Sequence, residues 1–220
     1  MRKSFAVLVL VVGGFWGSSQ AKAGSICGAV TGNLVANCGF ESGDFTSWTI
    51  SGITDDPVSF GIPTYYGVDT GDANSGNYGA YMSQDYNDDG PGTVNLSQTL
   101  ATSVGSTYDI TYYLENDAPG PTNGYTETFS SIFGGTTVQT LAPTLATPGP
   151  VGAFTEYSFA ETATSASTTL EFDFENDANY WSFDDVSVVV AATPEPSTGL
   201  LGGLALGALL LLCHRKKASV

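Results

Sequence analysis

Most residue types that perform catalysis are missing from the greater part of this sequence. His214 is the only histidine, and all six lysines and arginines lie within the first 22 or the last six residues. The long stretch between them therefore contains no Ser-His-Asp or Cys-His arrangement, no lysine for a Schiff base and no basic clamp for phosphate. Hydrolysis of a glycosidic bond by two carboxylates is the one enzymatic reaction left open. With 22 scattered acidic residues, some suitably spaced pair arises by chance, so we expect a protein that is not an enzyme.

The distribution of charged residues along the sequence limits the kinds of molecule that the protein can bind. All 22 acidic residues lie between Glu41 and Glu195, a stretch without a single lysine or arginine. Such a surface repels phosphate backbones, so nucleic-acid binding is excluded. Neutral polymers, divalent cations or a basic protein fit it, and carboxylates without basic partners suit calcium, which takes six to eight oxygen ligands. Asp85, Asp88 and Asp89 form an acidic group, but their spacing is not that of an EF-hand, and a solvated turn is the preferred interpretation.

Sugar binding requires exposed aromatic rings that stack on pyranose faces. We select Tyr65, Tyr66 and Trp181 as candidates, because Tyr65 and Tyr66 follow Pro63 in an expected loop. Aromatic residues make up 12% of the chain, so most rings belong to the core, and each candidate is alternatively a core residue. Trp48 is assigned to the core. Weaker candidates of the same kind are Tyr86, Tyr125 and Tyr180.

The elements that position these residues are expected to be strands. Leu170, Phe172 and Phe174 alternate with acidic residues, and a period of two places one set in a core and the other toward solvent. Strands are expected at 45–51, 78–83, 93–100, 108–114, 127–133, 137–141, 154–160, 170–175 and 181–190. Many short strands separated by turn-rich pieces predict an all-β sandwich or barrel, formed by one domain over residues 24–193.

The cysteines agree with an oxidising compartment. Cys27 and Cys38 lie close together, and a disulfide between them would contribute about 2–3 kcal/mol. Two free thiols are the alternative. A zinc site is not expected, since two cysteines without a nearby histidine do not complete a tetrahedral shell.

The two ends of the chain carry targeting patterns. Residues 1–23 have a basic start, a short apolar run and the small-residue site Ala21-Lys22-Ala23, which together predict a secretory signal peptide. Residues 197–213 form an uncharged stretch of about 26 Å as a helix, which predicts a transmembrane helix. The basic cluster that follows favours the cytoplasmic side, so the acidic domain is expected outside.

The segment before that helix carries a family resemblance. Pro194-Glu195-Pro196, an apolar helix and a basic end, in this order over residues 194–220, resemble the PEP-CTERM sorting signal of Gram-negative bacteria that make extracellular polysaccharide. The resemblance implies recognition by an exosortase, cleavage near the Pro-Glu-Pro motif and a transient membrane anchor. It also implies a location at the cell surface or in the extracellular matrix.

The domain between the ends carries a second resemblance. Segment 33–43 (NLVANCGFESG), followed by Trp48, and segment 181–188 (WSFDDVSV) look like the galactose-binding-like jelly roll shared by many carbohydrate-binding modules. The resemblance implies a jelly-roll β-sandwich with a structural calcium ion between the first and last strands. The matching ligands here are Glu41 and Asp184, with Asp185 as the alternative to Asp184. Solvated surface acids are the other interpretation.

These observations lead to three hypotheses. The first is an exported carbohydrate-binding module that acts without catalysis on extracellular polysaccharide. The second is a structural or adhesive surface protein without a specific sugar ligand. The third is a glycosidase that uses carboxylates alone.

Overall fold

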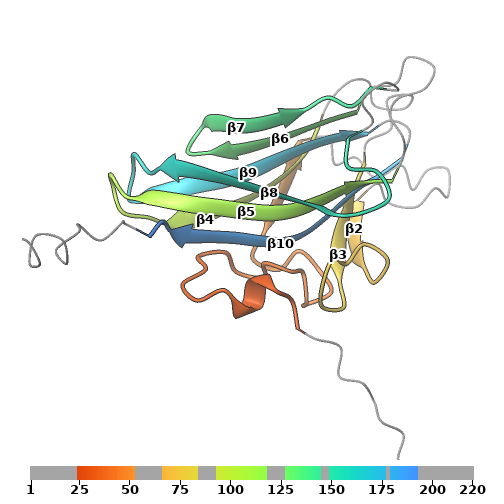
Figure 1. Cartoon of the computed structure of the whole chain (residues 1–220), viewed down its shortest axis with the longest axis horizontal. Coiled ribbons are helices and arrows are strands. Elements are labelled where there is room, and N and C mark those ends of the chain that lie inside the picture. The colour runs from red at the N-terminus through yellow and green to blue at the C-terminus, as the bar shows by residue number, and fades with distance from the viewer. Residues whose placement is uncertain are drawn as a thin grey trace, which may run out of the picture.

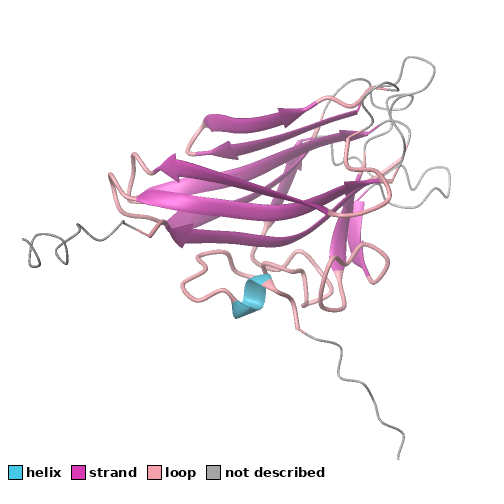
Figure 2. Ribbon diagram, viewed as in Figure 1, coloured by secondary structure: helices cyan, strands magenta, loops and turns pink. Residues whose placement is uncertain are grey.

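The chain folds into two five-stranded antiparallel sheets packed face to face (Figure 1). The computed structural model describes residues 24–52, 66–83, 93–117, 127–144, 149–176 and 179–192. Figure 2 shows that strands make up most of this described chain, together with one short helical turn. The elements in chain order are η1 (Cys27–Ala29), β1 (Thr49–Gly52), β2 (Tyr66–Asp69), β3 (Gly79–Met82), β4 (Val94–Ala101), β5 (Thr107–Asn116), β6 (Glu127–Phe133), β7 (Thr136–Leu141), β8 (Thr155–Thr162), β9 (Ser167–Asn176) and β10 (Trp181–Val190).

The strand order brings distant parts of the chain together. One sheet has the order β1-β4-β9-β6-β7, and the other has the order β2-β3-β10-β5-β8. The last strand, β10, is therefore the centre of the second sheet and pairs with β3 on one side and β5 on the other. The all-β prediction is confirmed, and the two sheets form the sandwich expected of a jelly roll.

Buried and outward-facing side chains alternate along β5 and β9, as the period-two pattern predicts. Leu170, Phe172 and Phe174 of β9 are fully buried, whereas Glu171 and the other acids of this strand alternate toward the outer face. In the core between the sheets, the rings of Phe172 and Phe183 lie 4.6 Å apart. Trp48 is buried as predicted and stacks on Phe40.

Nine of the ten strands correspond to strands expected from the pattern, and β2 does not. Strand β2 has only four residues, includes Gly67 and pairs with β3, with Tyr66 opposite Met82. The loop predicted around Tyr66 is therefore wrong at this residue, which lies in a strand.

The targeting segments fall outside the described residues. These are the signal peptide at 1–23, the motif Pro194-Glu195-Pro196 and the helix expected at 197–213. Within the part that the structure describes, no helix is long and apolar enough to cross a membrane.

Candidate functional site

The outer face of the β2-β3-β10-β5-β8 sheet gathers polar and aromatic side chains at the start of β10. Ser182 of β10 lies opposite Tyr81 of β3 and Glu115 of β5 in the strand register. Their neighbours along the strands, among them Phe183 and Ala80, point into the core and are fully buried. The alternation of β3 and β10 thus directs Tyr81 and Ser182 to the same outer surface.

This surface contains a depression of about 310 Å³ between the end of β2 and the end of β5. Its lining residues are Asp69, Asp72, Tyr81, Asp117 and Tyr180. The rings of Tyr81 and Tyr180 meet edge to face, with their centroids 5.5 Å apart. The depression is thus lined by two aromatic rings and three carboxylates.

Gly67 creates the space for one of the two rings. It pairs with Tyr81 across the β2–β3 ladder, and a Cβ atom at position 67 would overlap the tyrosine ring and its hydroxyl. The missing side chain therefore lets the ring of Tyr81 lie over the β2 backbone. A glycine inside a strand commonly marks such a close approach.

The carboxylates of the depression compete for few donors. The hydroxyl of Ser182 lies 2.6 Å from Asp72 Oδ1 and 3.1 Å from Asp117 Oδ1, but it has one proton to donate. Asp69 accepts the backbone N–H of Gly71. Burial, a hydrogen bond to Asp69 and the charges of Asp69 and Asp117 raise the pKa of Asp72 to about 6, against the effect of Ser182. Burial also raises the pKa of Asp117.

A second acidic group on this face holds the loop that follows β2. Glu41 Oε1 accepts the backbone N–H groups of Asn77 and Tyr78, at 2.7 and 3.2 Å. Asp184 Oδ2 accepts the backbone N–H groups of Asn74 and Ser75, at 2.9 and 3.1 Å. The two carboxylates thus fix neighbouring parts of one loop, and we call this arrangement the carboxylate clamp of loop 72–78.

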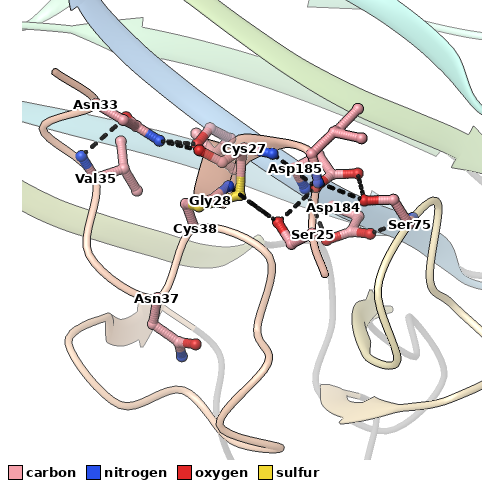
Figure 3. The surroundings of a disulfide bond; sticks show 12 residues. Ser25, Cys27, Gly28, Asn33, Val35, Asn37, Cys38, Ser75, Asp184 and Asp185 are labelled. Carbon is pink, nitrogen blue, oxygen red and sulfur yellow. Dashed lines mark hydrogen bonds between the residues drawn. A yellow bond between two sulfur atoms is a disulfide. The ribbon is translucent and has the colours of Figure 1, made fainter. Parts of the chain in front are cut away.

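Asp185 joins the clamp to the start of the domain (Figure 3). Its Oδ1 accepts the hydroxyl of Ser25 and the N–H of Cys27, and its Oδ2 accepts Asn74 Nδ2 and the hydroxyl of Ser75. Asp185 is 2% exposed and has a φ of 53°, at a bulge between Asp184 and Ser187 where β10 shifts its register against β5. The bulge turns both aspartates toward the loop and the N-terminal segment.

The N-terminal segment covers the open edge of β10. Strand β3 pairs only with 181–183, and beyond it Leu34 donates its N–H to Val188 O while Val186 donates to Cys38 O, both at 2.9 Å. The Cys27–Cys38 disulfide closes this segment, with the two Cα atoms 6.1 Å apart, so that prediction is confirmed. The disulfide lies beside Asp185 and Ser25 (Figure 3).

The carboxylates of the clamp accept hydrogen bonds from the chain itself, whereas the resemblance implies that Glu41 and Asp184 bind calcium. Asp184 Oδ2, Glu41 Oε1 and both oxygens of Asp185 each accept two donors, which is the number of lone pairs that a carboxylate oxygen has. Among the described residues, no group of three Asp, Glu, Cys or His side chains is placed to hold a metal ion. The residues present therefore fit hydrogen-bond donors better than a cation, and calcium binding stays a prediction for experiment.

Burial governs the protonation of the clamp. Asp184 is fully buried, and burial followed by the charge of Asp185 raises its pKa to about 8. The N–H groups of Ser75, Asp185 and Asn74 act in the opposite direction because they favour the ionised form.

The sugar-binding candidates chosen from the sequence have different positions. Tyr66 faces the core side of β2, half-buried against Phe45, with 6.2 Å between ring centroids. Trp181 is fully buried and donates its indole N–H to Glu175 O, so it offers no ring face to a ligand. Tyr180, a weaker candidate, lies in the depression. Three further candidates, Tyr65, Tyr86 and Tyr125, lie outside the described residues. The acidic group Asp85, Asp88 and Asp89 also lies outside them.

The sequence interpretation missed Tyr81 and the three aspartates of the depression. One signal for Tyr81 was present, because it alternates with Ala80 and Met82 in a predicted strand and so had to face outward. Asp69 and Asp72 lie close together at and after the end of β2, but Asp117 follows β5, and only the strand order brings it to them. No pattern in the sequence marks this set.

Comparison with known proteins shows the fold. No protein-family model matches the sequence, and no curated protein matches it either. A family 61 carbohydrate-binding module, solved in complex with β-1,4-galactotriose, has a TM-score of 0.51 at 16% identity, over 72% of this chain and 99% of its own. The enzymatically active domain of tailspike protein 4 of bacteriophage CBA120 has a TM-score of 0.50 at 16% identity, over 72% of this chain and 21% of its own. The chain thus shares the jelly-roll fold of such modules, and a shared fold alone does not assign a function.

Proposed function

We propose that the chain is an exported protein whose jelly-roll domain binds carbohydrate without catalysis. The observation that carries the proposal is the depression lined by the Tyr81 and Tyr180 rings together with the carboxylates of Asp69, Asp72 and Asp117. Sugar rings bind where an apolar ring face contacts an aromatic side chain and hydroxyl groups donate to nearby acceptors. The fold supports the proposal, because a carbohydrate-binding module of similar fold has been solved with a galactotriose bound.

Export and sorting belong to the same proposal. The signal-peptide pattern at 1–23 and the Pro194-Glu195-Pro196 motif support export across the inner membrane, followed by exosortase cleavage near the motif. The Cys27–Cys38 disulfide supports an oxidising compartment. The partner is then a polysaccharide of the cell surface or extracellular matrix, and the membrane is contacted through residues 197–213 before processing.

The proposal is tested by retention of the purified protein on a panel of insoluble and native polysaccharides. We expect at least one polysaccharide to retain it, and we expect Tyr81→Ala and Tyr180→Ala each to weaken the retention by about tenfold, the loss typical of one stacking contact. Tyr66→Ala is the matched control, because it removes a half-buried tyrosine of the same sheet that faces the core. It should lower the melting temperature and leave retention unchanged.

Two outcomes would contradict the proposal. If no polysaccharide retains the protein, the structural or adhesive surface protein becomes the better hypothesis. If retention occurs but depends on Tyr66 rather than on Tyr81 and Tyr180, the binding site lies elsewhere. Release of reducing ends from the bound polysaccharide would overturn the non-catalytic part of the proposal.

A further inference from the structure

We propose that the depression selects a sugar that carries a protonated amine, so that its preferred ligand is a cationic, glucosamine-type glycan. This inference rests on the proposed function and adds the chemical class of the ligand. It is carried by the three carboxylates that line the depression, two of which bond to Ser182, by the absence of any basic group in this stretch of sequence and by the two tyrosine rings of the same depression.

The carboxylates of the depression lack positive charge from the chain itself. No lysine, arginine or histidine occurs between Lys22 and His214, so the described residues contain no cationic side chain. Asp69, Asp72 and Asp117 line one hollow, and Glu115 lies beside them on β5, opposite Ser182. Carboxylates that converge in this way repel one another unless a proton or a cation lies between them.

The lack of nearby positive charge is reflected in the pKa values of the carboxylates in and beside the depression. Burial and the neighbouring aspartates raise the pKa of Asp72 to about 6, and burial and Asp117 raise the pKa of Glu115. At acidic pH a proton therefore supplies part of the missing positive charge. Above that pH an ammonium group of a ligand would take its place, with up to three N–H donors for the carboxylate oxygens.

An organic ammonium group fits the depression better than a metal ion does. Calcium requires six to eight oxygens at short range, and no group of three ligating side chains with such placement occurs among the described residues. An ammonium group needs only two or three acceptors and gains further from aromatic faces. The rings of Tyr81 and Tyr180 line the depression, and the pKa of Tyr180 is raised mainly by burial, with smaller contributions from Tyr81, Asp117 and Asp72.

The test compares two oligosaccharides with the same ring and linkage. Glucosamine hexamer and N-acetylglucosamine hexamer, both β-1,4-linked, differ only in the acetyl groups that remove the charge. We expect calorimetric titration at pH 7 and low salt to show at least tenfold tighter binding of the glucosamine hexamer. We also expect Asp72→Asn to reduce this preference to about twofold, because it removes the charge and retains an acceptor for Ser182.

A matched control separates the site from the overall charge of the protein. Asp173→Asn removes one charge on the outer face of the other sheet, from a half-buried aspartate whose pKa burial and Glu171 also raise to about 6. This variant should keep the full preference. Equal losses in Asp72→Asn and Asp173→Asn would show that net charge, rather than the depression, attracts the amine.

The pH dependence gives a second readout. The titratable groups that line the depression are Asp69, Asp72, Asp117, Tyr81 and Tyr180, and Glu115 lies next to them opposite Ser182. Protonation of the carboxylates removes the negative charge that an amine needs. We therefore expect binding of the glucosamine hexamer to weaken severalfold from pH 6 to pH 4, a range in which its amines stay protonated, while the acetylated hexamer changes little. An unchanged affinity for both would contradict the inference.

The remaining outcomes distinguish the inference from the function on which it rests. If the acetylated hexamer or a neutral polysaccharide binds as tightly as the glucosamine hexamer, the amine preference fails and carbohydrate binding stands. If neither hexamer binds and no polysaccharide is retained, the proposed function fails as well. If calcium chloride binds with a stoichiometry of one and Asp72→Asn abolishes it, the depression is a metal site and the inference is overturned.

Discussion

The carboxylate clamp and the depression are two acidic groups on the same sheet, built from the same residue type, yet their surroundings differ. In the clamp, Glu41, Asp184 and Asp185 accept hydrogen bonds from backbone N–H groups, hydroxyls and an amide of the chain itself. In the depression, Asp72 and Asp117 share the single hydroxyl of Ser182. Carboxylates that the chain supplies with donors hold a loop, whereas carboxylates with few donors remain available to a ligand.

The two groups are also connected. Loop 72–78 begins with Asp72, which belongs to the depression, and continues to Asn74 and Ser75, which belong to the clamp. The clamp therefore determines where one wall of the depression lies. A change in the clamp should affect both stability and binding, whereas a change in the depression that leaves its charges in place, such as Gly67→Ala, should affect mainly binding.

The largest expected effect comes from the clamp residue with the most partners. Asp185→Ala removes the acceptor of four donors from Ser25, Cys27, Asn74 and Ser75, and it leaves those donors buried or half-buried without it. We expect the free energy of unfolding to fall by about 3 kcal/mol, measured by urea denaturation. Asp185→Asn should lose less, because asparagine tolerates the positive φ of 53° and keeps one acceptor oxygen. Similar losses for the two variants would contradict the role given to the hydrogen bonds.

Two glycine substitutions distinguish the role of the clamp in stability from the role of the depression in binding. Gly76 has a φ of +66°, and a Cβ atom there would overlap the carboxylate of Glu41, so Gly76→Ala should cost about 2 kcal/mol of stability. Gly67→Ala instead displaces the ring of Tyr81 at the depression. We expect it to weaken polysaccharide retention by about tenfold and to change the melting temperature little. If Gly67→Ala destabilises the protein as strongly as Gly76→Ala does, the separate roles given to the clamp and the depression are wrong.

A change of pH should alter the free energy of unfolding less than the substitutions in the clamp do. The pKa of Asp72 and of Asp173 is raised from 3.8 to about 6 in the folded protein, so the folded state binds more protons than the unfolded state between these values. Stability is then highest below pH 4 for these two groups and falls as the pH rises through 6. Both side chains are about half exposed, so the loss should be on the order of 1 kcal/mol for the two together. Asp184, whose pKa is raised to about 8, lowers stability over the same range, so the contribution of these two groups is measured as a difference between variants. Urea midpoints at pH 4.5 and pH 7.5 should differ less in Asp173→Asn and in Asp72→Asn than in the unchanged protein.

Calcium removal should have the smallest effect. Because donors of the chain occupy the oxygens of Glu41, Asp184 and Asp185, we expect a chelator to change the melting temperature by less than about 1 °C. A clear rise in melting temperature on adding calcium, lost in Glu41→Gln, would instead support the calcium site that the jelly-roll resemblance implies.

The sequence predicted the strands well because their signal is local. Residues 181–190 were expected as one strand and form β10 with the same bounds, since apolar and polar residues alternate along its first half. Strand β2 was missed because four residues with a glycine contain no recognisable period. Tyr66 was consequently placed in a loop and interpreted as a ligand contact, although it faces the core side.

The site was harder to predict because it depends on which strands become neighbours. Asp69, Tyr81, Asp117 and Tyr180 meet only because the order β2-β3-β10-β5 brings four chain segments side by side. Glu41 and Asp184 were predicted as calcium ligands, and in the structure both accept hydrogen bonds from loop 72–78. Their chemistry was not predictable, because whether a carboxylate meets N–H groups or a cation depends on the path of a loop more than a hundred residues away from Asp184.

The position of the N-terminal segment has a consequence for how the domain is made. Leu34 and Cys38 bond to Val188 and Val186, and Ser25 bonds to Asp185, so the first described residues complete their contacts only on the last strand. Contacts between residues about 150 positions apart are slow to form, because a long loop must close before they yield any stabilisation. The N-terminal segment therefore completes its contacts only after β10 has been synthesised, and β10 is the strand whose arrival permits folding to finish.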